Sequence, residues 1–538
     1  YTYSKAGSLQ QTTNIVYDEG TGRISNAGFL HGGNAKNFGF GYLPGTNLIE
    51  NITMPNNMSL TQGYEANRDL VASMQYKRNT TSVVERHYTY DELGRPATRQ
   101  TARNGEVYTD SFAYNSRSEL TEATIHGRNY TYSYDNIGNR KEFYETGWTF
   151  DYETNAQNQY TRIVKQLENN EFVPEYDADG NATLIKTEAD TWRITYNGAN
   201  RPVRFENEGT NTVVEMGYDY LGRRFFKKVT VSGTVTLHQR YIYRGFLQIA
   251  AVDLTRGGHP ALWFVTWDPT QQTGTRPLAI QKNGSWFAYG WDITKNVCEV
   301  FGPSGYIRES YSYTPFGKIY STGDVNQPFR WSSEYYDAEL DLIYYNYRHY
   351  SPTLGRWLSR DPIEEQGGLN LYAFCKNNSV SQWDNLGNVV PIAVGGVIIP
   401  ISAIEAAALA MGLGISACLE NITCRELALA YMKEAIDAIA VQLKISLCEA
   451  AYWEYKSPNC AKCTQNTTLT HNTFNCACWG HVYFWRKSYI KMKCDYFLLG
   501  SIRKGSKIAE DGHLKELKNV ENAMNKCCNK ICCDEKNT

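Results

Sequence analysis

The chain has 538 residues, of which 54 are Lys or Arg and 56 are Asp or Glu, so its formal net charge is −2. A chain of this length exceeds what one hydrophobic core supports, and we expect two or more domains. Acidic and basic residues are mixed throughout, and such a balance gives no indication of a nucleic-acid partner. The chain opens with YTYSKAGSLQ, which has no initiator Met and no signal-peptide pattern, so we expect any targeting segment to lie upstream.

Two residue counts divide the chain. It contains 40 Tyr against 20 Phe, far more Tyr than an ordinary globular chain carries. Of the 14 Cys, only Cys298 and Cys375 precede residue 388. The change in composition predicts the main domain boundary near residue 388.

A short turn motif repeats through the first part of the chain. Its clearest copies are YTYDELGRP (88–96) and YSYDNIGNR (132–140), and successive copies lie mostly about twenty residues apart. Tyr-x-Tyr places both rings on one face of a strand. Asp or Asn then starts a turn that a nearby Gly closes with positive φ. Looser copies begin at Ile15, Phe112, Pro174, Ile194 and Met216.

Two strands and two turns per copy predict a long antiparallel meander built hairpin by hairpin over residues 1–327. An ordinary β-sandwich is the alternative, but a sandwich does not need one turn motif repeated over such a length. A long meander must hide its edges and its apolar face, and spiralling or closing into a shell does both.

These repeats resemble the YD-repeat family, also called Rhs proteins, which includes the C components of Tc toxins. The resemblance covers most of residues 1–388. It implies a mainly β fold in which the YD-repeat β-hairpin meander is wound into a hollow shell, or cocoon. The composition after residue 388 predicts that a mostly α, cysteine-rich C-terminal domain, residues 389–538, follows the shell.

Residues 328–388 carry a second, more specific pattern. They contain YYNYRHYSP, GRWLSRDP, GGLNLYAF and WDNLG in order, and this segment is similar to the Rhs-repeat-associated core that plugs the shell. The resemblance implies an autoproteolytic pair, Asp361 and Asp384, with Arg348 assisting. Two carboxylates held close share a proton, so one can act as base while the other polarises the scissile carbonyl.

The resemblance places the cut at the bond between Asn388 and Val389. Chemistry alone favours a turn-opening role for both aspartates, because Asp-Pro and Asp-Asn are common turn starts. The second motif of the family usually reads Asp-Pro-x-Gly-Leu, whereas here Asn385 replaces the Pro and Asn388 replaces the Leu. These departures flank the bond and bear on the efficiency of cleavage.

An apolar stretch opens the C-terminal domain. Residues 389–419 contain one charge, Glu405, and three interpretations remain open: a membrane span, a helix that makes transient membrane contact during translocation, or a helix packed in the shell. The Ala and Gly content favours the second and third over a stable span. Residues 426–456 then have the apolar spacing of an amphipathic helix.

Twelve Cys follow residue 388, and we favour disulfides in an exported domain. A zinc site at Cys460, Cys463, Cys476 and Cys478 is the weaker alternative, and no other cofactor is indicated. No catalytic motif assigns an activity to the domain. Its candidate bases are His471, His481 and His513.

The leading hypothesis is the encapsulating scaffold of a polymorphic, Rhs-type toxin, secreted or displayed at the cell surface. It would house a C-terminal effector and act as a single-turnover intramolecular aspartic autoprotease. Its partners would be its own C-terminal domain, an immunity protein and delivery machinery. The alternative is a cell-surface adhesion or structural protein that binds carbohydrate or protein.

Overall fold

The structure is a computed structural model that describes residues 2–5, 8–168, 170–188, 190–271, 274–388, 392–394 and 397–399. These residues belong to one compact unit, Tyr1–Ser402. In the apolar stretch 389–419, where a helix was predicted, the described residues 392–394 and 397–399 are instead two short paired strands. The rest of residues 389–538, with the predicted amphipathic helix and all twelve Cys, lies outside the described residues.

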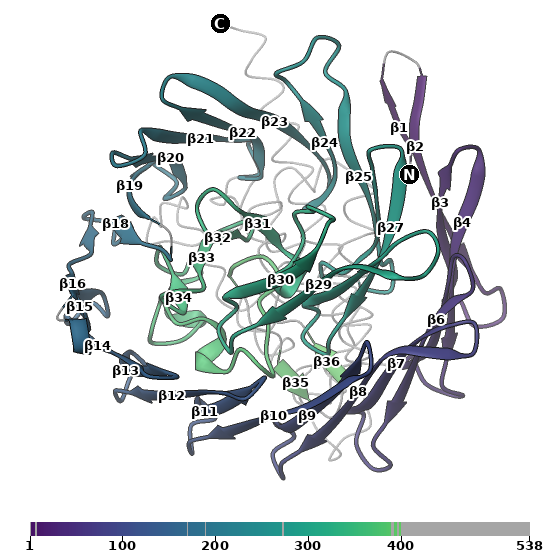
Figure 1. The fold of residues 1–538 in the computed structure, drawn as a ribbon, viewed down its shortest axis with the longest axis horizontal. Helices are drawn as coiled ribbons and strands as arrows, with labels where there is room; N and C mark the ends of the chain where they lie inside the picture. Colours follow the sequence, from purple (N-terminus) through teal and green to yellow (C-terminus); the bar gives the residue numbers. More distant parts are fainter. Residues whose placement is uncertain are drawn as a thin grey trace, which may run out of the picture. The chain divides into compact units, whose positions relative to one another are not determined.

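The first sheet has 16 strands in the order of the sequence, and all its pairings are antiparallel. Figure 1 shows these strands in purple to blue, following one another along a curved path. Consecutive hairpins produce this order, as the repeated turns predict. The strands are β1 (Thr2–Lys5), β2 (Ser8–Tyr17), β3 (Ile24–His31), β4 (Asn34–Tyr42), β5 (Ile49–Met54), β6 (Met58–Tyr64), β7 (Val71–Arg78), β8 (Thr81–Tyr90), β9 (Pro96–Arg103), β10 (Glu106–Tyr114), β11 (Leu120–Ile125), β12 (Arg128–Tyr134), β13 (Arg140–Glu145), β14 (Trp148–Thr154), β15 (Tyr160–Lys165) and β16 (Asn170–Phe172).

The second sheet has 14 strands, again in sequence order. Together the two sheets confirm the predicted β-hairpin meander wound into a shell. The strands are β17 (Glu175–Tyr176), β18 (Ala182–Lys186), β19 (Thr191–Tyr196), β20 (Pro202–Asn207), β21 (Thr212–Tyr218), β22 (Arg224–Val231), β23 (Thr234–Arg244), β24 (Leu247–Asp253), β25 (Ala261–Trp267), β26 (Pro277–Lys282), β27 (Ser285–Trp291), β28 (Val297–Phe301), β29 (Ile307–Tyr313) and β30 (Ile319–Gly323).

The core segment, residues 328–388, forms a small four-stranded sheet that lies between the long sheets (Figure 1). One apolar cluster joins Phe29 of β3, Val300 of β28 and Trp357 of the core segment, so the segment packs against both sheets. The boundary at residue 327 stays a prediction. The remaining elements are β31 (Tyr335–Asp337), β32 (Leu342–Tyr344), β33 (His349–Ser351), β34 (Arg356–Trp357), β35 (Ile392–Val394), β36 (Val397–Ile399) and the 3₁₀ turns η1 (Gln166–Glu168), η2 (Trp331–Ser333), η3 (Glu364–Gln366) and η4 (Cys375–Asn377).

Each repeated turn is closed by its own Asp or Asn side chain, as predicted. Asp91 Oδ1 accepts hydrogen bonds from the backbone N–H groups of Leu93 (3.0 Å) and Arg95 (2.9 Å). Gly94 has a φ of +76°, which Gly adopts without a steric penalty. The same pair of bonds recurs at Asn115, Asp135, Asn155, Asp177, Asn197, Asp219 and Asp292.

The pairing register shifts by one residue directly before the aromatic residue of these turns. The shift occurs at Thr89/Tyr90, at Ser133/Tyr134 and at Gly217/Tyr218. A β-bulge of this kind bends its strand and increases the local twist. Because the bulge recurs at successive motif turns, we infer that it contributes to the curvature of the sheets.

The phenol of most motif tyrosines ties its turn to the previous hairpin. Tyr90 donates to the backbone carbonyl of Val71 (2.7 Å), and Tyr218 donates to that of Pro202 (2.8 Å). Phe has no hydroxyl and cannot make this bond, which favours Tyr over Phe at this position of the motif. Equivalent bonds are made by Tyr42, Tyr64, Tyr114, Tyr134, Tyr196, Tyr243 and Tyr313.

Replacing Tyr218 by Phe is expected to lower the free energy of unfolding by about 1 kcal/mol, the net value of one such hydrogen bond. Tyr220→Phe is the matched control, because Tyr220 lies two residues away and is 90% exposed. Chemical denaturation of both variants measures the difference. Equal effects of the two substitutions would contradict a specific role for the Tyr218 hydroxyl.

One feature differs from the expectation of a single continuous sheet: the meander divides between β16 and β17. Val173 and Pro174 separate these strands, and neither residue pairs in a ladder. Pro lacks the N–H group that a central ladder needs, and it restricts the residue before it. The break therefore has a local cause at Pro174.

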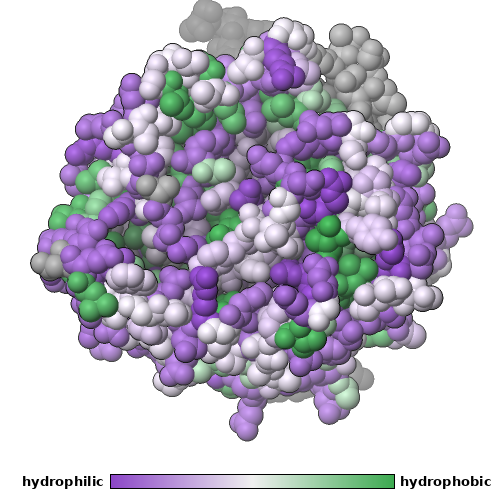
Figure 2. Space-filling view, in the orientation of Figure 1, coloured by the Kyte–Doolittle hydropathy of each residue, from purple (hydrophilic) through white to green (hydrophobic). Residues whose placement is uncertain are grey.

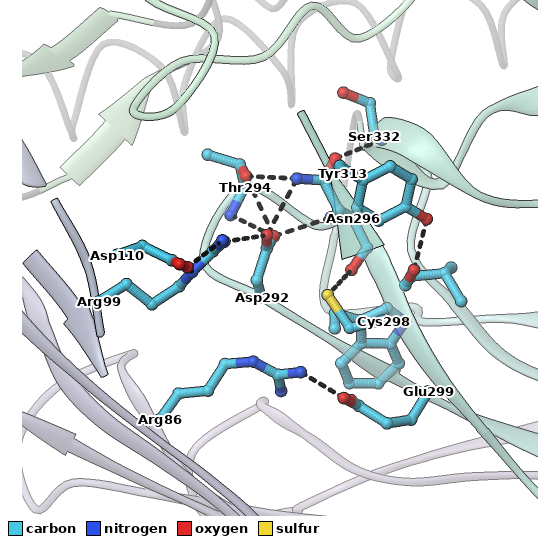
Figure 3. A network of polar contacts seen from close by, with 12 residues as sticks. Arg86, Arg99, Asp110, Asp292, Thr294, Asn296, Cys298, Glu299, Tyr313 and Ser332 are labelled. Carbon is cyan, nitrogen blue, oxygen red and sulfur yellow. Dashed lines mark hydrogen bonds and ion pairs between the residues drawn. The ribbon is translucent and has the colours of Figure 1, made fainter. Parts of the chain in front are cut away.

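Buried ion pairs connect the first sheet to the second (Figure 3). Arg86 of β8 pairs with Glu299 of β28, and both side chains are buried. Arg99 of β9 lies 2.7 Å from Asp110 and reaches Asp292, in the β27–β28 turn, at 3.5 Å. A buried charge that lost its partner would be strongly unfavourable, so these pairs specify which strands of the two sheets face each other.

The face of the molecule in Figure 2 is largely hydrophilic, with small separate apolar patches. This pattern fits sheets that turn their apolar faces inward.

Candidate active site

The three residues predicted from the core motifs lie together. Arg348 precedes β33, Asp361 follows β34, and Asp384 follows η4. Arg348 Nη2 lies 2.8 Å from Asp361 Oδ2 and 3.6 Å from Asp384 Oδ2. The guanidinium thus links two carboxylates that are separated in the sequence.

Asp384 closes a turn of the same kind as the shell repeats. Its Oδ1 accepts the backbone N–H groups of Leu386 (3.1 Å), Gly387 (2.7 Å) and Asn388 (3.1 Å). The turn-opening role that chemistry alone favoured for this residue is therefore present. The second carboxylate oxygen faces Arg348, so Asp384 can close the turn and also take part in the pair with Asp361.

Gly387 is required where the turn passes the core strands. Its φ is +85°, and a Cβ at this position would lie 2.9 Å from Tyr345 Cβ and 3.1 Å from the Arg348 nitrogen. The neighbouring carbonyls are also held. The backbone N–H of Tyr347 donates to Leu386 O (2.8 Å), and Arg348 Nε donates to Gly387 O. The backbone leading to Asn388 is thus held at several consecutive residues.

Asp361 is the carboxyl whose proton affinity is shifted toward neutral pH. Burial raises its pKa to about 6 against the opposing effect of Arg348, and the charge of Asp384 adds to the rise. Its Oδ1 accepts the N–H of Ile363 at 3.1 Å. At neutral pH the pair can therefore exchange a proton through Asp361.

Arg348 is fixed by stacking as well as by charge. Its guanidinium carbon lies 4.1 Å from the centre of the Trp357 ring, and its side chain is 2% exposed. Arg356 has similar surroundings, since it lies 3.9 Å from the ring centre of Tyr160 and 4.8 Å from that of Tyr372. Aromatic rings thus hold both arginines of the core segment in place.

A pocket of about 250 Å³ opens at this cluster. Its lining includes Arg348, Asp361, Asp384 and Asn388. The Oδ1 atom of Asn388 is buried and has no hydrogen-bond partner within the described part of the chain. The predicted acid–base pair and the residue at the predicted cut therefore share one cavity.

Comparison with known proteins identifies the family of this fold. The teneurin YD-shell profile matches residues 3–380, more than half of the chain. The chain belongs to the teneurin YD-shell family.

Relatives of this YD-shell chain include proteins named as toxins. Toxin protein Tse5 of Pseudomonas aeruginosa is 27% identical over 259 residues, which cover 43% of this chain and 20% of Tse5. The tRNA3(Ser)-specific nuclease WapA of Bacillus spizizenii is 26% identical over 316 residues, covering 57% of this chain and 11% of WapA. The YD-shell chain thus spans about a fifth or less of the length of these relatives.

The crystal structure of TcdB2-TccC3-Cdc42 has a similar fold. Its TM-score is 0.59 at 18% identity, and the match covers 71% of this chain and 21% of that chain. At this identity the likeness shows the fold alone, and that fold is the YD-shell.

Sequence reasoning missed a second buried cluster of the YD-shell. Lys295 Nζ lies 2.7 Å from Thr275 Oγ1 and 3.5 Å from Glu334 Oε1. Burial raises the pKa of Glu334 to about 7, although Lys295 opposes the rise, and the charge of Asp384 adds to it. Thr275 and Lys295 lie in two successive motif turns of the second sheet, and Glu334 lies in the core segment, so only the folded chain brings the three together.

The other site predictions fall elsewhere in the YD-shell chain. Cys460, Cys463, Cys476 and Cys478 lie outside the described residues. Within the described ranges, no group of three His, Cys, Asp or Glu side chains is arranged to hold a metal ion. No helix among the described residues has the length and apolar character to cross a membrane.

Proposed function

We propose that the YD-shell encloses residues 389–538, cuts the chain once at the Asn388–Val389 bond and delivers the released segment as a toxic effector. The cut is supported by one observation above all. Arg348, Asp361 and Asp384, which are distant in sequence, meet in a pocket that Asn388 also lines. The effector role is supported by two relatives, the toxin protein Tse5 and the tRNA3(Ser)-specific nuclease WapA.

In this proposal the two carboxyls have different roles. Asp361 carries a proton at and below pH about 6 and donates it to the nitrogen of the departing segment. Asp384 holds the backbone of residues 386–388 and pairs with Arg348. Arg348 fixes Asp361 and the carbonyl of Gly387 at once. Such positioning, rather than any single strong interaction, lowers the barrier of an intramolecular step.

The partners in the proposal follow from the same function. The shell holds its own cut C-terminal segment, other toxin components carry it outside the producing cell, and an immunity protein protects that cell. Transient membrane contact through residues 389–419 belongs to the release step.

The test is a denaturing gel of the purified full chain. We expect two bands, residues 1–388 and residues 389–538, that co-elute on a sizing column before denaturation. Asp384→Asn should give one intact band. Asn closes the same turn at Asn155, whose Oδ1 accepts two backbone N–H groups at 3.0 Å, so the substitution preserves the turn and removes only the charge.

Asp177→Asn is the matched control, because Asp177 closes an equivalent turn away from the pocket. This variant should be cut like the parent chain. An uncut parent chain, or a fully cut Asp384→Asn chain, would refute the proposed role of Asp384.

A further inference from the structure

We propose that Asn388 is itself the nucleophile: its side-chain amide nitrogen attacks its own backbone carbonyl carbon, closes a succinimide ring and expels the amine of residue 389. This inference rests on the proposed function, since it names the attacking group of that same cut. The family motif usually has Leu at this position, and Leu offers no nucleophile. Asn388 supplies one on the residue whose carbonyl must be attacked.

The turn positions the backbone for this reaction. Asp384 Oδ1 holds the N–H groups of residues 386, 387 and 388 together. Arg348 Nε and the Tyr347 N–H hold the two preceding carbonyls. The backbone nitrogen of Asn388 is therefore anchored, and the atoms that must meet belong to one fixed residue. Intramolecular attack gains most when the reacting groups are held in this way.

The side chain of Asn388 is not anchored in the same manner. Its Oδ1 is buried without a hydrogen-bond partner in the described ranges, and an unpaired buried polar atom costs about 1–3 kcal/mol. The oxygen and nitrogen of such an amide are assigned from hydrogen bonds, and either assignment leaves one end unpaired here. Ring closure removes the unpaired amide, because the side chain of Asn388 rotates toward the backbone carbonyl of the same residue.

Atoms and protons balance without water in the first step. The bond between Nδ2 and the Asn388 carbonyl carbon forms, and the bond between that carbon and the nitrogen of residue 389 breaks. Nδ2 loses one proton, and the leaving amine gains one. Asp361 lines the same pocket and relays this proton as general acid and base. Water enters later, when it opens the succinimide to a C-terminal Asn or isoasparagine.

This assignment also gives Asp384 a single role. Its Oδ1 is engaged by three N–H groups and its other oxygen faces Arg348, so neither oxygen needs to activate a water molecule. Asp384 is then a positioning residue that holds the turn and, through its charge, the Arg348 side chain on the Gly387 carbonyl. Asn388 and Asp361 are the groups that touch the reacting atoms.

The test compares Asn388→Leu and Asn388→Asp in the full chain. Leu, the usual family residue, has no nucleophilic group, so only an external water molecule could cut this variant, whereas Asp matches Asn in size and lacks the nucleophilic nitrogen. We expect both variants to remain intact and the parent chain to split. Melting temperature and circular dichroism matched to the parent chain confirm that the variants fold, and the near-isosteric Asp variant serves if the Leu variant does not.

The chemical product gives an independent readout. Trypsin cuts after Lys376 and releases the peptide NNSVSQWDNLGN, residues 377–388. Shortly after refolding at mildly acidic pH, this peptide should be lighter by the mass of one water molecule, and it should later become a mixture of Asn and isoasparagine ends. If both variants split at the same bond and the first product is the free acid, the inference is wrong while the proposed cut stands. A parent chain that never splits would refute the proposed cut itself, and with it this inference.

Discussion

Asp337→Asn is expected to lower the free energy of unfolding of the shell by about 3–5 kcal/mol, because it leaves the buried Arg224 without its carboxylate partner and removes one of the two carboxylates at Lys227. Asp337 Oδ2 lies 2.6 Å from Arg224 Nη1 and its Oδ1 lies 2.9 Å from Lys227 Nζ, and these side chains are at most 2% exposed. Arg224 and Lys227 belong to β22, and Asp337 belongs to β31. The carboxylate therefore fastens the core segment to the second sheet.

Lowering the pH should also reduce the stability of the parent chain. Burial alone would raise the pKa of Asp337, but Arg224 and Lys227 outweigh burial and hold the pKa well below its usual range. The folded state then binds the proton less tightly than the unfolded state, so this contribution is complete above pH about 4 and is lost as the pH falls below it. Asp337→Asn should flatten the acid side of the stability profile.

Asp324→Asn is the control for charge removal. Asp324 pairs with Arg308 at the surface, where the two side chains are 62% and 45% exposed, and exposed pairs contribute little. Urea denaturation measures the loss in free energy of unfolding for both variants. A loss at Asp337 no larger than the loss at Asp324 would contradict the fastening role.

Asp361→Asn is expected to slow the cut by a factor of about 10²–10⁴, the usual contribution of a positioned acid–base group. The amide cannot deliver a proton to the departing nitrogen, although it can still accept the N–H of Ile363. Glu364→Gln is the matched control, because Glu364 lies in the same turn and is exposed. The rate is measured on gels after dilution of the denatured chain into refolding buffer.

The parent chain should also show a pH dependence. Burial raises the pKa of Asp361 to about 6, so the carboxyl is protonated below this pH and ionised above it. If Asp361 delivers its proton in the slow step, the rate falls as the pH rises through about 6. A rate that rises over this interval would mean that Asp361 acts as a base in that step.

Local patterns predicted much of this molecule. Tyr-Asp followed by Gly is a complete turn in itself, so the turn at Asp91 and its neighbours could be read directly from the chain. The pairing of Asp361 with Asp384 was different, because only the resemblance to the Rhs core indicated that two such turns meet. Trp-Asp copies at Trp267 and Trp291 were missed, although each indole donates to a preceding strand as the tyrosines do.

Long-range features were beyond a local pattern. Nothing in the sequence around Asp337 indicates that Arg224 and Lys227 will surround it, because the contact forms only when the second sheet meets the core segment. Pro174 could have predicted the break between the two sheets, since Pro interrupts a ladder. The break was missed because Pro174 begins PEYDADGNA, which is a copy of the repeated turn motif.

The most direct test of the central claim is the N-terminal sequence of the small fragment that separates from the purified chain on denaturation. The account predicts VVPIAV, which begins at Val389. A fragment that begins at any other residue, or a chain that stays whole while folded, would contradict it.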